Sequence, residues 1–114
     1  MKEEADKKSY IDPQKSLEAK ERGNEFFKEG KFPESIKEYS EAIKRNPDDH
    51  VLYSNRAASY TKLGEYNMAV KDCDISIKLN PKFGKYRKFQ KNSVLFFIIF
   101  LEFSSVFYIN LLFL

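Results

Sequence analysis

Cysteine, histidine and tryptophan are scarce in this sequence of 114 residues, which has one cysteine, one histidine and no tryptophan. The lone Cys73 excludes an internal disulfide and fits a reducing compartment, so we expect a cytoplasmic protein. Because His50 is the single histidine, few residues are available to form a catalytic dyad or a metal site. A glycine-rich phosphate loop, a metal-ligand spacing and a nucleophile motif are also missing. We therefore predict that the chain is not an enzyme and uses no cofactor or metal.

An excess of charge of one sign is also missing, because the formal net charge is only +3. All twenty Lys and Arg residues lie at or before Lys91, where acidic residues are interleaved with them. This pattern is typical of a solvated helical surface and does not indicate a nucleic-acid partner. The segment from Met1 to Lys8 is charged and lacks the apolar stretch of a signal peptide.

An internal repeat is the main feature that the sequence does contain. When the chain is shifted by 34 residues, many positions carry the same residue. Conservative pairs, such as Phe26 with Tyr60, occupy further positions. The identical pairs include Arg22 and Arg56, Lys28 and Lys62, Gly30 and Gly64, Lys37 and Lys71, Ile43 and Ile77, Lys44 and Lys78, and Asn46-Pro47 and Asn80-Pro81. A period of this length is that of the tetratricopeptide repeat (TPR), a helix–turn–helix unit.

Local signals place helices in each unit. Helix formers lead up to Gly30, a residue suited to a helix C-terminus, and Pro33 suits the start of the next helix. Asn46-Pro47 then stops that helix, and the second unit repeats the order. The predicted helices are Leu17–Glu29, about Pro33–Arg45, Val51–Leu63 and Asn67–Leu79.

Apolar residues fall at helical spacing and predict a packed core. Gly23, Ala42, Ala57 and Ala69 would let paired helices approach closely. We expect Cys73 to pack inside, with the flanking Asp72 and Asp74 facing solvent. Asp48-Asp49-His50 is expected to cap the helix near Val51. The predicted core also contains Phe26, Phe27, Ile36, Tyr39, Ile43, Tyr53, Tyr60, Val70 and Ile77.

The predicted fold class is all-α, an array of TPR helical hairpins followed by a hydrophobic segment. Its parts are a charged lead segment (1–15), repeat 1 (16–49), repeat 2 (50–83), the broken start of a third repeat (84–92) and a hydrophobic tail (93–114). Because such arrays usually need about three repeats, we expect the last complete helix to expose an apolar face. Whether two repeats fold alone, and whether that face forms oligomers, stays open.

Several longer stretches carry a more specific resemblance within the TPR family. They are Tyr10–Pro13, Arg22–Glu25, Tyr39–Pro47, Leu52–Ala58 and Tyr60–Leu63. In these stretches, and over roughly Lys8 to Lys85 as a whole, the chain closely resembles the heat-shock protein 70/heat-shock protein 90 organising protein family, also called the stress-induced phosphoprotein family. The correspondence is best to the last of that family's three TPR domains.

The resemblance implies an adaptor that grips the acidic C-terminal tails of heat-shock protein 90 and heat-shock protein 70. Such domains use a two-carboxylate clamp made of lysine, asparagine and arginine side chains. The clamp positions match Lys20 and Asn24 on the first helix, Asn55 on the third and Lys85 on the fifth. The family's final arginine lies farther along than Arg87, so Arg87 or Lys88 takes its place here.

Physical arguments allow such a clamp but do not single it out. Residues four apart on a helix share a face, so Lys20 and Asn24 can point at one ligand group. Lysine supplies charge and asparagine supplies amide donors. Spacing alone would favour an ordinary surface lysine, and the family match reverses that judgement. Arg56 has two interpretations, a second donor in the groove or a surface salt bridge with a neighbouring acid.

The tail from Val94 to Leu114 also has two interpretations. Its 21 residues, after Lys85, Arg87, Lys88 and Lys91, are enough for a membrane-spanning helix, which needs about 20. Glu102 opposes insertion by about 2.5–3.5 kcal/mol. Alternatively, Gly84-Lys85-Tyr86 can be encoded by GGT AAG TAT, a splice-donor sequence, and we favour intron read-through or an incomplete gene model. The alternatives to a chaperone adaptor are accordingly a tail-anchored TPR adaptor and a nonfunctional truncated product.

Overall fold

The computed structural model describes residues 2–82 of the chain. This part contains five helices and no strand: α1 (Lys2–Tyr10), α2 (Pro13–Lys28), α3 (Phe32–Arg45), α4 (His50–Lys62) and α5 (Tyr66–Leu79). The predicted broken third repeat and hydrophobic tail lie outside the described residues. Among the helices of residues 2–82, none has both the length and the apolar content that crossing a membrane requires.

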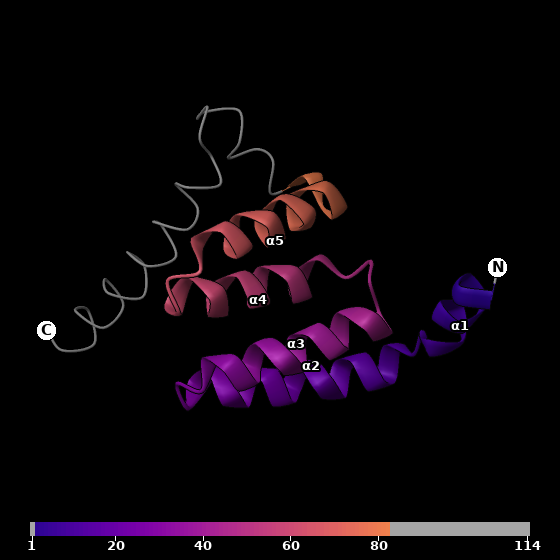
Figure 1. Ribbon diagram of the computed structural model, residues 1–114, viewed down its shortest axis with the longest axis horizontal. Helices are drawn as coiled ribbons and strands as arrows, with labels where there is room; N and C mark the ends of the chain where they lie inside the picture. Colours follow the sequence, from indigo (N-terminus) through magenta and orange to yellow (C-terminus); the bar gives the residue numbers. More distant parts are fainter. Residues whose placement is uncertain (1, 83–114) are drawn as a thin grey trace, which may run out of the picture.

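The four long helices form two hairpins that stack on each other. Helix α2 packs against α3, α4 packs against α5, and α3 packs against α4 to join the hairpins. Figure 1 shows this order, with α1 extending beyond the beginning of α2 at one end of the stack. The predicted all-α array of helical hairpins is therefore confirmed.

Helix α2 begins at Pro13, four residues before the expected Leu17, because Asp12 caps it. The Asp12 Oδ1 atom accepts hydrogen bonds from the backbone N–H groups of Gln14 and Lys15, both at 3.1 Å. Pro13 then lies in the first turn, where a missing N–H has no cost. At the start of α4, Asp49 accepts from the Val51 N–H at 3.0 Å, which confirms the expected cap.

The short α1 lies inside the predicted charged lead segment. Glu3 and Glu4 lie in its first turn and Lys7 and Lys8 in its last turn, where their charges interact favourably with the helix dipole and stabilise the helix. The end of α1 is tied to α3: the Arg45 guanidinium lies 3.5 Å from the centroid of the Tyr10 ring and donates to the Tyr10 carbonyl at 3.2 Å.

The turn inside each hairpin uses a glycine at the same repeat position. Gly30 and Gly64 both have φ of 75°, in the left-handed region that side chains disfavour. Each glycine follows the end of the hairpin's first helix, as the sequence predicts.

Small side chains build the core. Gly23, Ala42, Ala57 and Ala69 are all buried, as expected of small residues between paired helices. Leu52 is absent from the predicted core, yet it is fully buried. Burying such a side chain stabilises the fold by about 1.5–3 kcal/mol relative to leaving it exposed. The two core clusters consist of Ala19, Ala42 and Leu52, and of Ala57, Ala69 and Cys73.

The larger predicted core residues divide into two groups. Tyr39 and Tyr53 are buried. The remaining members are only partly buried; they are Phe26, Phe27, Ile36, Ile43, Tyr60, Val70 and Ile77. The thiol of Cys73 is buried as expected, and burial raises its pKa to about 12, so it stays protonated and unreactive.

Hydroxyl groups hold the helices together inside the core. The Oγ atoms of Ser35 on α3 and Ser59 on α4 lie 2.7 Å apart, so a buried hydrogen bond joins the two hairpins. Helix α5, at the end of the described stack, exposes large apolar side chains, including Tyr66 (47% exposed) and Met68 (40%). This is the exposed apolar face expected of the last complete helix.

Candidate peptide-binding site

Lys20 and Asn24 lie one turn apart on α2. Both side chains are partly buried and therefore remain in contact with solvent. Residues with this spacing share one face of a helix. Within the part of the chain that the structure describes, Lys20 forms no ion pair, so its charge is not neutralised by a neighbouring carboxylate there.

Asn55 brings a third polar side chain to the same place from α4. Its Nδ2 atom donates to the Oδ1 atom of Asn24 at 3.5 Å, although the two residues are 31 positions apart in sequence. The stacking of the hairpins therefore brings these two predicted site residues into contact. The remaining predicted site residues, Lys85, Arg87 and Lys88, lie outside the described residues.

Tyr39, a predicted core residue, also reaches this cluster. Its ring is buried, but its hydroxyl donates to Asn24 Oδ1 at 2.6 Å. A tyrosine in place of the cysteine found one repeat later, at Cys73, is the only sequence signal of this contact.

Arg56 forms a salt bridge, the second of its two interpretations, but the pair is mostly buried and does not lie at the surface. Its Nε and Nη2 atoms donate to the two carboxylate oxygens of Asp72, both at 2.7 Å, and its Nη1 atom donates to Ser40 Oγ at 3.1 Å. These bonds with Asp72 raise the pKa of Arg56, so the guanidinium is held in its charged form.

The expectation that Asp72 faces solvent is wrong. The residue is 2% exposed, because its carboxylate turns toward Arg56 instead of away from the hairpin. From the local sequence alone, an acidic residue beside a buried cysteine on a helix is expected to face solvent. Its partner on α4 is 16 residues away and is recognised only once the helices pair. Asp74 is partly buried.

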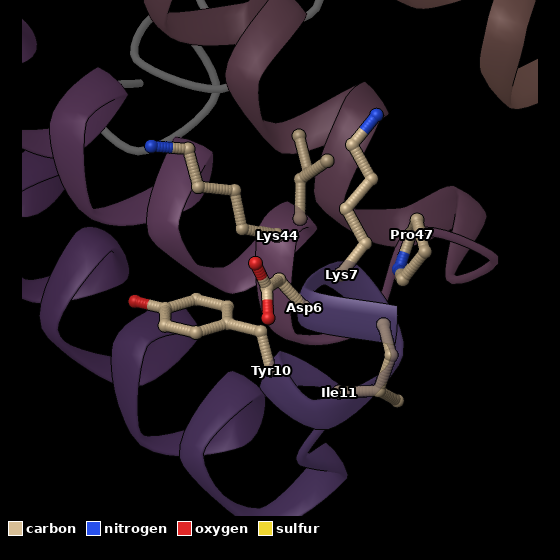
Figure 2. Close-up of a pocket in the computed structure, with 7 residues that line it drawn as sticks. Asp6, Lys7, Tyr10, Ile11, Lys44 and Pro47 are labelled. Carbon is tan, nitrogen blue, oxygen red and sulfur yellow. The ribbon is translucent and has the colours of Figure 1, made fainter. Parts of the chain in front are cut away.

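A cavity lies elsewhere on the molecule. It has a volume of about 640 Å³ and contains none of the predicted site residues. Figure 2 shows it between α1 and the end of α3, with the Tyr10 ring below the Lys7 and Lys44 side chains. Its lining is Asp6, Lys7, Tyr10, Ile11, Ile43, Lys44 and Pro47. Lys20, Asn24 and Asn55 do not line this cavity, and each is partly exposed.

The side chains of that cluster have a chemistry that suits an anionic ligand. Lys20 supplies a positive charge, and the carboxamides of Asn24 and Asn55 supply neutral N–H donors. Within residues 2–82, no group of three or more His, Cys, Asp or Glu side chains is arranged to hold a metal ion.

Comparison with known proteins identifies the family. The sequence model described as "TPR repeat" matches residues 23–64, and the one described as "Tetratricopeptide repeat" matches residues 50–83. Together these matches extend over more than half of the chain. The protein therefore belongs to the tetratricopeptide-repeat family.

A more specific relationship is to the Hsp70-Hsp90 organizing proteins. The chain is similar to Hsp70-Hsp90 organizing protein 3 of Arabidopsis thaliana, with 49% identity over 98 residues. The matched region covers 86% of this chain but only 17% of that relative's length. The resemblance that the sequence motifs predict is thereby confirmed.

Solved structures of TPR domains have the same fold. The TPR2AB domain of yeast Sti1, in its pHSP90 complex, superposes with a TM-score of 0.68 and 39% identity, covering 69% of this chain and 31% of that one. The first TPR of Spaghetti (RPAP3), bound to the HSP90 peptide SRMEEVD, gives a TM-score of 0.62 at 39% identity, covering 63% and 57%.

Proposed function

We propose that this chain is a co-chaperone adaptor module that binds the acidic C-terminal peptide of heat-shock protein 90 or heat-shock protein 70. It does so through a partial carboxylate clamp of Lys20, Asn24 and Asn55, which Lys85 and either Arg87 or Lys88 extend. The observation that carries the proposal is the meeting of Asn24 on α2 with Asn55 on α4, one turn from Lys20.

The comparisons support this choice of ligand. The relative is named for heat-shock proteins 70 and 90, and the two structural neighbours contain heat-shock protein 90 or its peptide. The peptide SRMEEVD carries three side-chain carboxylates, besides its free C-terminus when unmodified. Uncharged amide donors beside a lysine suit such a ligand, since no carboxylate of the cluster would repel it.

The adaptor would act without catalysis. Binding would rest on charge-assisted hydrogen bonds at the surface, so it should weaken as salt is added. We place the protein in the cytoplasm, where the single thiol of Cys73 stays reduced.

The test is a fluorescence-anisotropy titration of the full chain with labelled SRMEEVD and with the same peptide amidated at its C-terminus. We expect binding of the free acid and at least about tenfold weaker binding of the amide, because a charged hydrogen bond contributes about 1.5–3 kcal/mol. Equal binding of the two peptides would contradict a clamp on the terminal carboxylate.

Matched variants locate the site. Lys20→Ala and Asn24→Ala should each weaken binding of the free acid about tenfold. Lys15→Ala, an exposed lysine on the same helix, and Asn67→Ala, an exposed asparagine on α5, should leave it unchanged. If Lys15→Ala weakened binding as much as Lys20→Ala, the attraction would come from general charge and the clamp would be rejected.

A further inference from the structure

The contact between Tyr39 and Asn24 depends on a missing side chain. A Cβ atom at Gly23 would lie 2.6 Å from Cε1 and 2.7 Å from Cδ1 of the Tyr39 ring, closer than such atoms approach. With glycine there, the ring of α3 lies directly on the backbone of α2. The hydroxyl then reaches the next residue along α2, which is Asn24.

Two donors converge on one oxygen of Asn24. The Tyr39 hydroxyl approaches Oδ1 to 2.6 Å and the Asn55 Nδ2 atom approaches it to 3.5 Å. Because burial raises the pKa of Tyr39 to about 12, its hydroxyl keeps its proton at any physiological pH. Within residues 2–82 the Nδ2 group of Asn24 has no hydrogen-bond partner, so its two N–H donors stay available.

We propose that Tyr39 is a positioning residue of the binding site: its hydroxyl fixes the Asn24 carboxamide so that Nδ2, and not Oδ1, is presented to a carboxylate ligand. This inference rests on the proposed peptide-binding function. A carboxamide has donors on one side and an acceptor on the other. If it rotated by half a turn, Oδ1 would face the ligand and repel its carboxylate. The packing of Tyr39 on Gly23 therefore determines whether the Asn24 side chain attracts or repels the ligand's carboxylate.

The second hairpin shows that this arrangement is not a general requirement of the repeat. The residues one repeat after Gly23, Asn24 and Tyr39 are Ala57, Ala58 and Cys73. Cys73 packs against Ala57 in the core. A helical hairpin thus packs without a tyrosine hydroxyl at this position, so core packing alone does not explain Tyr39.

The first experiment is a double-mutant cycle on peptide binding. Tyr39→Phe keeps the ring and removes the donor, and we expect it to weaken binding of SRMEEVD about threefold to tenfold. In the Asn24→Ala background, Tyr39→Phe should have no further effect, because the group that it positions is gone. Tyr53→Phe is the matched control: it removes a buried tyrosine's bond to the Pro47 carbonyl, 2.9 Å long, away from the site. It should leave binding unchanged.

Two outcomes of this cycle would overturn the inference while the proposed function stands. One is wild-type affinity in Tyr39→Phe. The other is the same loss from Tyr39→Phe whether Asn24 is present or absent, which would mean a general structural effect.

A second measurement needs no peptide, so it judges the inference even if the chain does not bind SRMEEVD. Nuclear magnetic resonance of the full chain detects the Asn24 side-chain NH₂ group, assigned by its disappearance in Asn24→Ala. We expect restricted motion of this group in the wild type and clearly faster motion in Tyr39→Phe, with no change in Tyr53→Phe. Unchanged motion in Tyr39→Phe would overturn the inference.

Discussion

Two ion pairs occupy equivalent positions in the two hairpins, yet their surroundings differ. Arg22 and Glu38 of the first hairpin meet at 2.9 Å with side chains 53% and 22% exposed. Arg56 and Asp72, each 34 residues later, meet at 2.7 Å with side chains 18% and 3% exposed. The same pairing of charges is a surface contact in one hairpin and an interior contact in the other.

The position of each hairpin in the stack explains the difference. Arg56 lies between the hairpins and also donates to Ser40 on α3 of the first one, at 3.1 Å. The residue one repeat before Ser40 is Asp6, in the short α1, and within residues 2–82 no hairpin before α2 covers Arg22. Burial in a repeat protein is therefore set by neighbours in the stack as much as by the repeat sequence.

Another pair of contacts shows what the repeats keep in common. In the first hairpin, Ser16 Oγ donates to the Ala42 carbonyl at 2.8 Å. One repeat later, His50 and Ser76 take these positions, and Ser76 Oγ donates to the His50 carbonyl at 3.0 Å. The donor has moved to the opposite helix, but the same two positions are joined. The packing geometry is thus kept while the residue that provides the bond changes.

Removing the two arginines should give the largest difference between the hairpins. Arg56→Ala leaves the carboxylate of Asp72 buried without its partner, so we expect a loss of about 3–5 kcal/mol in the free energy of unfolding. Arg22→Ala breaks a solvent-exposed pair and should cost less than about 1 kcal/mol. Urea denaturation of the full chain measures both values. In a double variant, Arg56→Ala with Asp72→Ala should recover a large part of the loss. Equal costs for the two arginines would show that burial does not distinguish the pairs.

Within each hairpin, two residues face each other from the paired helices, and their sizes differ between the hairpins in a compensating way. The first hairpin combines Gly23 with the large Tyr39, and the second combines Ala57 with the small Cys73. Gly23→Ala should destabilise the chain by about 1–2 kcal/mol, because overpacking against the Tyr39 ring outweighs the gain in helix propensity.

Copying the second hairpin's pair into the first sharpens this prediction. In a Tyr39→Cys background the ring is gone, so Gly23→Ala should stabilise by up to about 1 kcal/mol through helix propensity. A double-mutant cycle by urea denaturation gives the coupling between the two sites. If the two substitutions were additive, the close approach of the ring to Gly23 would not be the cause of the cost.

The helices were predictable from the sequence because their signals are local. Gly30 and Gly64 mark the hairpin turns, and the prolines mark helix boundaries. The predicted start of α2 at Leu17 is four residues late, because it rests on the helix formers that lead up to Gly30 and not on the cap at Asp12. A capping residue followed by proline is a local signal that could have corrected it.

The candidate site was predictable only in part, since its contacts join distant residues. Lys20 and Asn24 could be paired from their spacing, and Asn55 was added from the family resemblance. The role of Tyr39 depends on how closely α3 approaches α2, which no local pattern records. For Asp72, alignment of the repeats held a usable signal: both Arg22 and Arg56 have an acidic residue 16 positions later.

Tyr39 and Cys73 lie one repeat apart, and burial affects both in the same direction, which gives the smallest expected effect. Burial raises the pKa of Tyr39 from 10.0 to about 12 and that of Cys73 from 9.0 to about 12. In each case the folded protein binds the proton more tightly than the unfolded chain does. The resulting stability is fully present below the unfolded pKa and is lost as the pH rises toward 12.

As the pH rises from about 8 to about 10.5, we therefore expect the titration of each residue to lower the free energy of unfolding by on the order of 1 kcal/mol. Cys73 should begin to act at lower pH than Tyr39, because its unfolded pKa is lower. Urea denaturation at several pH values should show a shallower decline for Tyr39→Phe and for Cys73→Val than for the wild type. Tyr66→Phe removes an exposed hydroxyl on α5 and should follow the wild-type decline. If the free energy of unfolding fell in parallel for all four proteins, the protonation of neither buried group would be coupled to folding.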